Sequence, residues 1–438
     1  MTSNGTEFVG WTPSPDGRGP EFIIVLAIGQ KSSARRSVVK FKQAGYTQWT
    51  ITHGFFADMG GFVLAADDLR RPIPLNAEQL FYLVNNSYVD YPDTNDRELK
   101  DRNKSDGLAR LITLWQGTWF VITFVARLIQ GLHVTTMELT AVSFVIILFG
   151  TAWCWKDKPS DVGTTITVRC LTTMEDILIR EGRQPDQPYY QTPLDFISRD
   201  ETALNLAWQY YNELSRKILF SPFSRRVKEV PWDRNPGDIF LRMDFDLELV
   251  GVAFIFVFSA VFLGAWNFSF PSTVERDFWR VASVYMLAYG MFGALWMELC
   301  MWIFIPQYRL AEGLELSLVE QALDQRPHPV RNWHYKFQNW RRSRFSKIRG
   351  TGDSDGEGLA SRRPKKGVFA FLSRTYNISQ GRDPHLGVQV GFLCVTSFLC
   401  ASYCVFRLFI FVEDFIGLRA LPSSAYKTVE WAEFIPHI

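Results

Sequence analysis

Acidic side chains inside long apolar segments are the first candidates for chemistry in this 438-residue chain. Glu298 lies within the apolar stretch MFGALWMELCMWIFI, and Glu138 stands near the start of another. A charge at the centre of a bilayer costs about 2.5–3.5 kcal/mol, so such residues usually have a partner or a function. Glu298 is either a carboxyl bonded to a neighbouring helix, or a proton or cation site or a catalytic acid. Glu138 is the second candidate acid.

A further group of charges is expected near one membrane surface, at the ends of apolar segments. Its members carry opposite signs and are Arg127, Glu138, Arg407, Glu413 and Asp414. We expect them to form a layer of Arg–carboxylate pairs on the outer side. In the interpretation that we favour, these side chains reach the interface and fix the helix ends. The alternative is a binding site for an anion or a lipid headgroup.

The stretch RNWHYKFQNWRRSRFSKIRG is strongly basic and contains no acid. Each Lys or Arg close to an anionic leaflet contributes about 1 kcal/mol of attraction, so this aromatic-rich stretch predicts contact with lipid headgroups. Binding of nucleic acid or calmodulin is typical of the same composition and is less favoured here. The residues concerned are Arg331, Lys336, Arg341, Arg342, Arg344, Lys347 and Arg349.

Five apolar windows are long enough to position these side chains in a bilayer. A helix needs about 20 apolar residues to cross, and a backbone in lipid must satisfy its own hydrogen bonds. Because no strict alternation of polar and apolar residues appears, the windows predict helices. The predicted fold is an all-α membrane protein with five transmembrane helices and two long cytosolic loops. The windows are residues 111–132, 136–155, 247–268, 281–305 and 386–412.

Lys and Arg beside these windows predict the orientation, since cytosolic loops are enriched in them. The chain then divides into seven parts, four of them outside the membrane. These are a cytosolic N-terminal region (1–110), a transmembrane hairpin (111–156), a cytosolic loop (157–246), a second hairpin (247–305), a basic cytosolic loop (306–385), a last helix (386–412) and an external tail (413–438). The plasma membrane and the endoplasmic reticulum both fit the lengths, because tilt absorbs a few Å of thickness.

Three shorter elements are expected outside the membrane, while the apolar run Phe22–Ile28 is too short to span it. GFFADMGGFVL predicts a buried or interfacial element, and AEQLFYLV predicts a helical turn or two. DETALNLAWQYYNELSRKIL has its apolar residues at helical spacing, with Leu204, Ala207 and Ile218 on one face and Asn205 on the other. This helix packs on the bundle or, in the alternative interpretation, binds a partner.

Sequence motifs for known chemistry are missing. We find no HExxH, GxSxG or P-loop motif, and the six histidines show no metal-ligand spacing. Six cysteines are too few for a disulfide scaffold. No cofactor and no metal are therefore predicted. The formal net charge of +2 does not suggest a nucleic-acid partner.

Several stretches carry a family resemblance, among them GFFADMGGFVL, TPLDFIS and the closing PHI. The chain resembles a large family of uncharacterised fungal multi-pass membrane proteins. The resemblance implies a membrane fold, and it transfers no catalytic or binding residue, because these motifs have no known role. Members of that family begin with an additional hydrophobic helix ahead of a segment like GPEFIIVLAIGQ. We expect that this chain lacks that helix, so that the intact architecture has a sixth.

Three functional classes follow. The leading prediction is a membrane accessory or scaffold protein that binds protein partners through its cytosolic loops. The second is a channel or transporter that uses Glu298. The third is a membrane-bound enzyme, a cyclase or tailoring step in fungal specialised metabolism, with Glu298 or Glu138 as the acid.

Overall fold

The computed structural model describes residues 19–92, 104–160, 162–186, 188–199, 202–219, 230–237, 239–301, 375–379 and 383–431. The chain is mostly helical and forms two compact units. The first takes its described residues from 1–199, 218–292 and 401–438, and the second from 200–217 and 293–400. Each unit is described separately.

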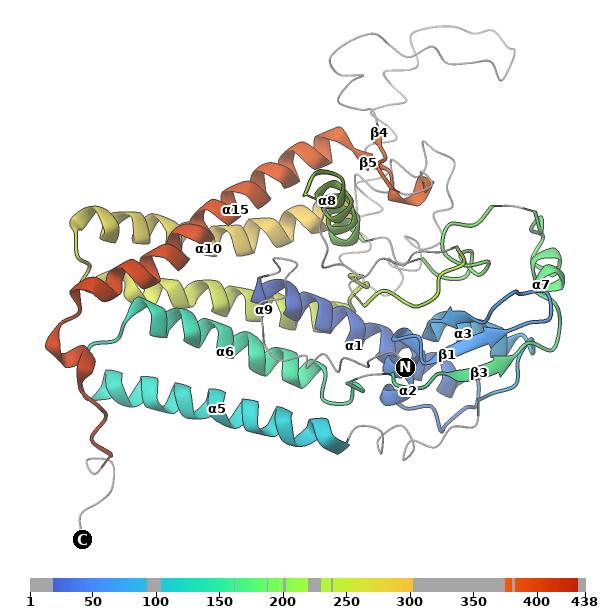
Figure 1. Ribbon diagram of the computed structural model, residues 1–438, viewed down its shortest axis with the longest axis horizontal. Helices are drawn as coiled ribbons and strands as arrows, with labels where there is room; N and C mark the ends of the chain where they lie inside the picture. The colour runs from blue at the N-terminus through green and yellow to red at the C-terminus, as the bar shows by residue number, and fades with distance from the viewer. Residues whose placement is uncertain are drawn as a thin grey trace, which may run out of the picture. The chain divides into compact units, whose positions relative to one another are not determined.

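Long helices dominate the first unit. α5 (Lys104–Ile129), α6 (Thr136–Cys154) and α9 (Phe245–Val261) run side by side, and a 3-10 helix, η1 (Phe262–Asn267), continues α9 (Figure 1). α10 (Thr273–Leu299) and α15 (Val390–Ile416) also contribute to the unit. Within the described residues, four segments are long and apolar enough to cross a membrane: Gly107–Ile129, Thr136–Cys154, Phe245–Asn267 and Val390–Ala420. They correspond to four of the five predicted windows, and they fit a membrane protein.

The predicted fourth window, 281–305, is a helix as far as Leu299 but is not among those four segments. Ser283, Tyr285, Tyr289 and Glu298 lower the hydropathy of its apolar half. The part of the window beyond Met301 lies outside the described residues.

The sequence analysis did not anticipate the 24-residue helix α1 (Pro20–Gln43). Its first half carries the short apolar run, and Ile24, Ala27 and Ile28 are buried in the same core as residues of α6 and α9. Two glycines allow the close approach. A Cβ at Gly150 would lie 2.9 Å from Cδ1 of Ile24, and a Cβ at Gly251 would lie 2.9 Å from Cδ1 of Ile28. The apolar run Phe22–Ile28, which is too short to span a membrane, is thus part of the buried end of the longer helix α1.

A small sheet corrects the prediction of an all-α fold. β1 (Phe62–Ala65) lies between β2 (Ile73–Leu75) and β3 (Ile166–Arg169). β1 pairs antiparallel with β2 and parallel with β3. Part of the physical reason is local: Gly60, at a φ of 79°, redirects the chain after α2, and β-branched residues fit a half-buried pleated surface. The other part is the pairing of β1 with the distant β3.

Three short helices pack with the sheet: α2 (Ile51–Asp58), α3 (Ala77–Asn85) and α7 (Met174–Arg180). The predicted element GFFADMGGFVL is the end of α2 together with β1, and AEQLFYLV is α3. In their core, Phe41 stacks on Trp49 with ring centroids 4.0 Å apart. Phe41 belongs to the second half of α1, so one helix contributes to the bundle core and to the sheet core.

The second unit contains α8 (Ala203–Leu219), the end of α10 and the start of α15. Two short strands, β4 (Thr375–Tyr376) and β5 (Val388–Gln389), pair antiparallel, and the 3-10 helix η4 (Pro384–Leu386) precedes β5. Leu206 and Ala207 of α8 pack with Phe392 and Cys300. This confirms the predicted amphipathic helix, with a shifted apolar face, since Ile218 is exposed and Asn205 is buried.

Candidate functional site

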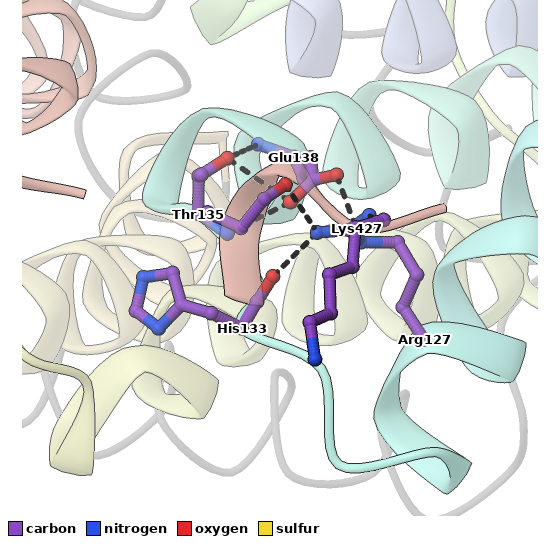
Figure 2. Close-up of polar contacts among 6 residues, drawn as sticks. Arg127, His133, Thr135, Glu138 and Lys427 are labelled. Carbon is purple, nitrogen blue, oxygen red and sulfur yellow. Dashed lines mark hydrogen bonds and ion pairs between the residues drawn. The ribbon is translucent and has the colours of Figure 1, made fainter. Parts of the chain in front are cut away.

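Arg127, in the last turn of α5, is held by four polar contacts (Figure 2). Its Nη1 donates to the carbonyl oxygen of Lys427 at 2.8 Å, and its Nη2 donates to those of His133 at 2.6 Å and Ala425 at 3.0 Å. Its Nε lies 3.4 Å from Oε1 of Glu138. A planar guanidinium suits this forked arrangement. The side chain therefore fixes the turn after α5 and the C-terminal segment 423–431 together.

Glu138 caps its own helix. Its Oε2 accepts from the backbone N–H of Thr135 at 2.8 Å, and its own N–H donates to the Thr135 hydroxyl at 3.1 Å. This reciprocal arrangement is a capping box at the start of α6. With Oε1 facing Arg127, both carboxylate oxygens have structural partners. The geometry favours a structural role for this candidate acid.

Further contacts hold the same C-terminal segment. It begins with the 3-10 helix η6 (Ser423–Tyr426), and another 3-10 helix, η5 (Gly417–Ala420), connects it to α15. Nε2 of Gln130 donates to the carbonyl oxygen of Glu430 at 2.9 Å, and the Glu430 N–H donates back to Oε1 of Gln130 at 3.1 Å. The rings of Trp119 and Trp431 stack 5.2 Å apart. The polar contacts at this end of the bundle thus serve mainly to secure the tail.

The other three members of the predicted polar layer form a separate group on α15. Arg407 lies over the rings of Phe144, Phe258 and Phe262, with Cζ 5.2, 5.3 and 5.2 Å from their centroids. Glu413 and Asp414 are each 3 % exposed. The structure therefore gives Arg127 with Glu138 one role, and leaves Arg407 with the two α15 carboxylates as a distinct cluster.

Glu298 lies in the last turn of α10, in the second unit, and is half-buried. Its role as an intramembrane acid stays a prediction. The seven basic residues expected at lipid headgroups, from Arg331 to Arg349, lie outside the described residues.

Sequence reasoning missed one buried acid, Glu21. It lies in the first turn of α1 and is only 7 % exposed, and neither of its carboxylate oxygens has a hydrogen-bond partner. The charge that acts on it is Arg407. A signal for it exists in the sequence, because Pro20 followed by an acid is typical of a helix start. The short apolar run concealed that signal.

Basic residues gather at the opposite ends of the same helices. This basic collar consists of Lys31, Arg35, Arg36 and Lys158. Nζ of Lys31 donates to the carbonyl oxygen of Trp153 at 3.2 Å and lies 3.3 Å from the centroid of its ring. Arg36 donates to Asp244 at 3.1 Å, at the start of α9.

Two more contacts complete the basic collar. Arg35 pairs with Asp246. Lys158 donates to Oε1 of Gln30 at 2.8 Å. Burial, and after it the neighbouring Arg110 guanidinium, lowers the pKa of Lys158 to about 8 from its ordinary value of 10.5. Lys31 and Lys158 lie over the rings of Trp153 and Trp155, and such pairs of a cation with a tryptophan are typical of a membrane interface.

The described residues contain no group of three or more His, Cys, Asp or Glu side chains that could hold a metal ion. Apolar helices of spanning length, charges with structural partners at one end and a collar of cations and tryptophans at the other are the features of a helical membrane protein. The chain matches the model of a family of unknown function (DUF8562) over residues 27–179 and 384–438. No curated protein and no solved structure matches it.

Some candidate site residues lie within the part of the chain that the family model matches, and others lie outside it. Arg127, Glu138, Arg407 and the two α15 carboxylates lie within them. Glu21, Glu298 and the predicted headgroup-binding stretch lie outside them.

Proposed function

We propose that the protein is a membrane scaffold that holds a folded cytosolic domain in a fixed position on a five-helix transmembrane bundle. The observation that carries the proposal is the continuity of α1. Ile24 and Ile28 lie in the bundle core, and Phe41 lies in the core of the sheet domain. A continuous helix shared by two cores transmits position between them, which a flexible linker does not.

Strand pairing supports the proposed orientation. β1 precedes α5 and α6 in the chain, and β3 follows them, yet the two strands are neighbours in one sheet. Both must lie on the same side of a membrane. The chain therefore crosses an even number of times between them, as a hairpin of α5 and α6 requires.

Contacts of the C-terminal segment support the fifth crossing. Arg127 and Gln130, at the turn after α5, bond residues 425, 427 and 430, so this turn and the segment lie on one side. In the described part of the chain between them, three segments have spanning length, at α6, α9 and α15. Three crossings would put the turn after α5 and the C-terminal segment on opposite sides of the membrane. In our proposal α10 is therefore a fourth crossing after that turn, which makes five with α5.

The basic collar indicates which end of the bundle faces the cytosol. Lys31, Arg35, Arg36 and Lys158 cluster at the end where α6 finishes and α9 begins. Because Lys and Arg favour the cytosolic side, that end faces the cytosol. The N-terminal domain and the two long loops are then cytosolic, and the C-terminal segment is external. The membrane is the plasma membrane or the endoplasmic reticulum, and the basic loop 306–385 lies on anionic headgroups.

Labelling of single cysteines tests this topology. In a variant without the six native cysteines, Tyr426→Cys should react with a membrane-impermeant maleimide in intact cells if the protein is in the plasma membrane. If it is in the endoplasmic reticulum, Tyr426→Cys should react only after the internal membranes are opened. Lys42→Cys should react only after permeabilisation, because it lies at the cytosolic end of α1. Both side chains are exposed in the fold, so access depends on the membrane alone. In either membrane the two cysteines lie on opposite sides, so reaction of both in the same step would contradict the five crossings.

A scaffold must also present a surface to its partner. Around α7, Leu171 and Ile179 are 59 % and 55 % exposed, although both belong to a well-packed domain. Isolated exposed apolar residues are common, but two large ones beside one short helix fit a contact surface.

Native mass spectrometry of the full chain, extracted from its own membranes in mild detergent, tests the scaffold role. We expect a partner protein at constant stoichiometry, and its loss in the double variant Leu171→Asp with Ile179→Asp. The neighbouring exposed Glu175→Gln is the matched control and should retain the partner. A partner-free chain that conducts ions in liposomes would instead favour the transporter class.

A further inference from the structure

Glu21 is buried without the hydrogen bonds that a buried carboxylate requires. Its carboxylate folds back over Gly19, where a Cβ would lie 2.6 Å from Oε1, and both oxygens lack a hydrogen-bond partner. An ionised carboxylate in an apolar interior is costly unless it is paired and hydrogen-bonded. The position at the N-terminal end of α1 adds a favourable helix dipole and the nearby backbone N–H of Glu21 itself.

Neighbouring helices indicate how deep Glu21 lies. Ile28 meets Gly251 near the start of α9, and Ile24 meets Gly150 near the end of α6. A helix rises 1.5 Å per residue, so Glu21 lies about 4.5 Å further into the bundle than Ile24. This is near the middle of both segments of spanning length. The depth in the membrane rests on the span assignment proposed above.

Arg407 reaches the same depth from α15. Its guanidinium lies among rings of α6, α9 and η1 and has one buried nitrogen, Nη1, without a hydrogen-bond partner. Tyr403 and Asp414 share its helical face, at spacings of four and seven residues, and both are buried with one unbonded oxygen each. A polar stripe therefore runs along α15 from the bundle interior to the end of the helix.

The charges in this cluster do not balance. Glu21 and Asp414 are two carboxyl groups, and among the described residues the one cation that acts on both is Arg407. From α6, the hydroxyls of Thr136 and Thr140 face Asp414. Glu413 is a third buried carboxyl on α15: it acts on Asp414, and it also faces Glu275 and Arg419, which pair with each other. Because Arg407 does not act on it, we count Glu413 with the Glu275–Arg419 pair and not with Glu21 and Asp414.

We propose that Glu21, Arg407 and Asp414 form an intramembrane proton-binding site that holds one exchangeable proton per chain. Two buried carboxyls that share one cation cannot both ionise without a large penalty, so one proton resides on one of them. When Glu21 holds it, Arg407 balances Asp414. When Asp414 holds it, Arg407 balances Glu21. The proton can thus exchange between the interior and the outer end of the bundle.

Infrared spectroscopy of the full chain in lipid nanodiscs tests the charge count, because only a protonated carboxyl gives the C=O stretch of an acid. Glu21→Gln or Asp414→Asn leaves one carboxyl for one cation, so either substitution should remove one carboxyl equivalent from this band at neutral pH. Arg407→Gln leaves two carboxyls without a cation, so the contribution of this site should rise about twofold. The double variant Arg407→Gln with Glu21→Gln should return it to the wild-type value.

Controls keep the outcomes distinct. Glu175→Gln on the surface should leave the band unchanged, and the near-isosteric Glu21→Gln should fold even if the Arg407 variants do not. A band unaffected by both Glu21→Gln and Asp414→Asn would overturn the proposal. So would a band that Glu298→Gln alone removes. None of these results depends on the partner or on the cysteine labelling, so the proton site and the scaffold role can fail separately.

Discussion

Replacement of Arg127 by alanine should release the C-terminal segment. The substitution removes three hydrogen bonds to backbone carbonyls and leaves Glu138 without its cation. Removing one partner of a buried pair costs about 3–5 kcal/mol, and Glu138 is partly exposed, so we expect about 3 kcal/mol. Trypsin should then cleave after the exposed Lys427 roughly a hundredfold faster in nanodiscs, because cleavage follows the population of the open form.

Further variants distinguish the hydrogen bonds of the Arg127 guanidinium from its positive charge. Arg127→Lys keeps the positive charge near Glu138 but cannot reach three carbonyls, so its cleavage rate should lie between wild type and Arg127→Ala. Gln130→Ala removes only the pair of bonds to Glu430 and should have a smaller effect. Equal rates in wild type and Arg127→Ala would show that other contacts hold the tail. The structural interpretation of this polar cluster would then be wrong.

The largest expected loss of stability comes from Trp49→Ala in the sheet domain. Trp49 is fully buried, stacks on Phe41, and donates from Nε1 to the Ser37 hydroxyl at 3.1 Å. Truncation of a buried Trp typically costs about 3–5 kcal/mol, from lost burial and the cavity left behind. Both contacts attach the core to α1, so the loss should also weaken the connection between the domain and the bundle.

Hydrogen exchange of the full chain measures this effect at the amides of β1. Trp49→Ala should raise their exchange, while the amides of α6 should change little, because the bundle core does not contain Trp49. Trp49→Phe is the control: it keeps a ring against Phe41 and loses the bond to Ser37, for about 1 kcal/mol. If Trp49→Ala raised the exchange of the α6 amides as much as that of the β1 amides, the bundle core and the sheet core would not be separable.

The structure changes which acidic residues are the strongest candidates for chemistry in the membrane. Glu138, a candidate acid in the sequence, has both oxygens in structural contacts. Glu21, which the sequence analysis did not single out, has neither oxygen bonded. A search for intramembrane chemistry therefore begins at Glu21 and Arg407, with Glu298 as the untested alternative.

The sequence alone was sufficient for the four helices of spanning length and for the amphipathic α8, though not for α1, because apolar blocks and helical spacing are local properties of the chain. It also placed Arg127 and Glu138 at one level, since a short turn joins α5 and α6. The sheet escaped prediction because β1 and β3 are about a hundred residues apart, and no local pattern encodes the pairing of distant strands.

Only the tertiary structure decided which charges have partners. Arg407, Glu413 and Asp414 looked like members of one layer with Arg127, but Arg127 contacts Glu138, the His133 carbonyl and two backbone carbonyls some 300 residues away. The run after Pro20 looked too short to matter, yet its helix contributes to two cores. Burial and charge balance depend on which helices pack together, and packing brings together residues that sequence spacing keeps apart.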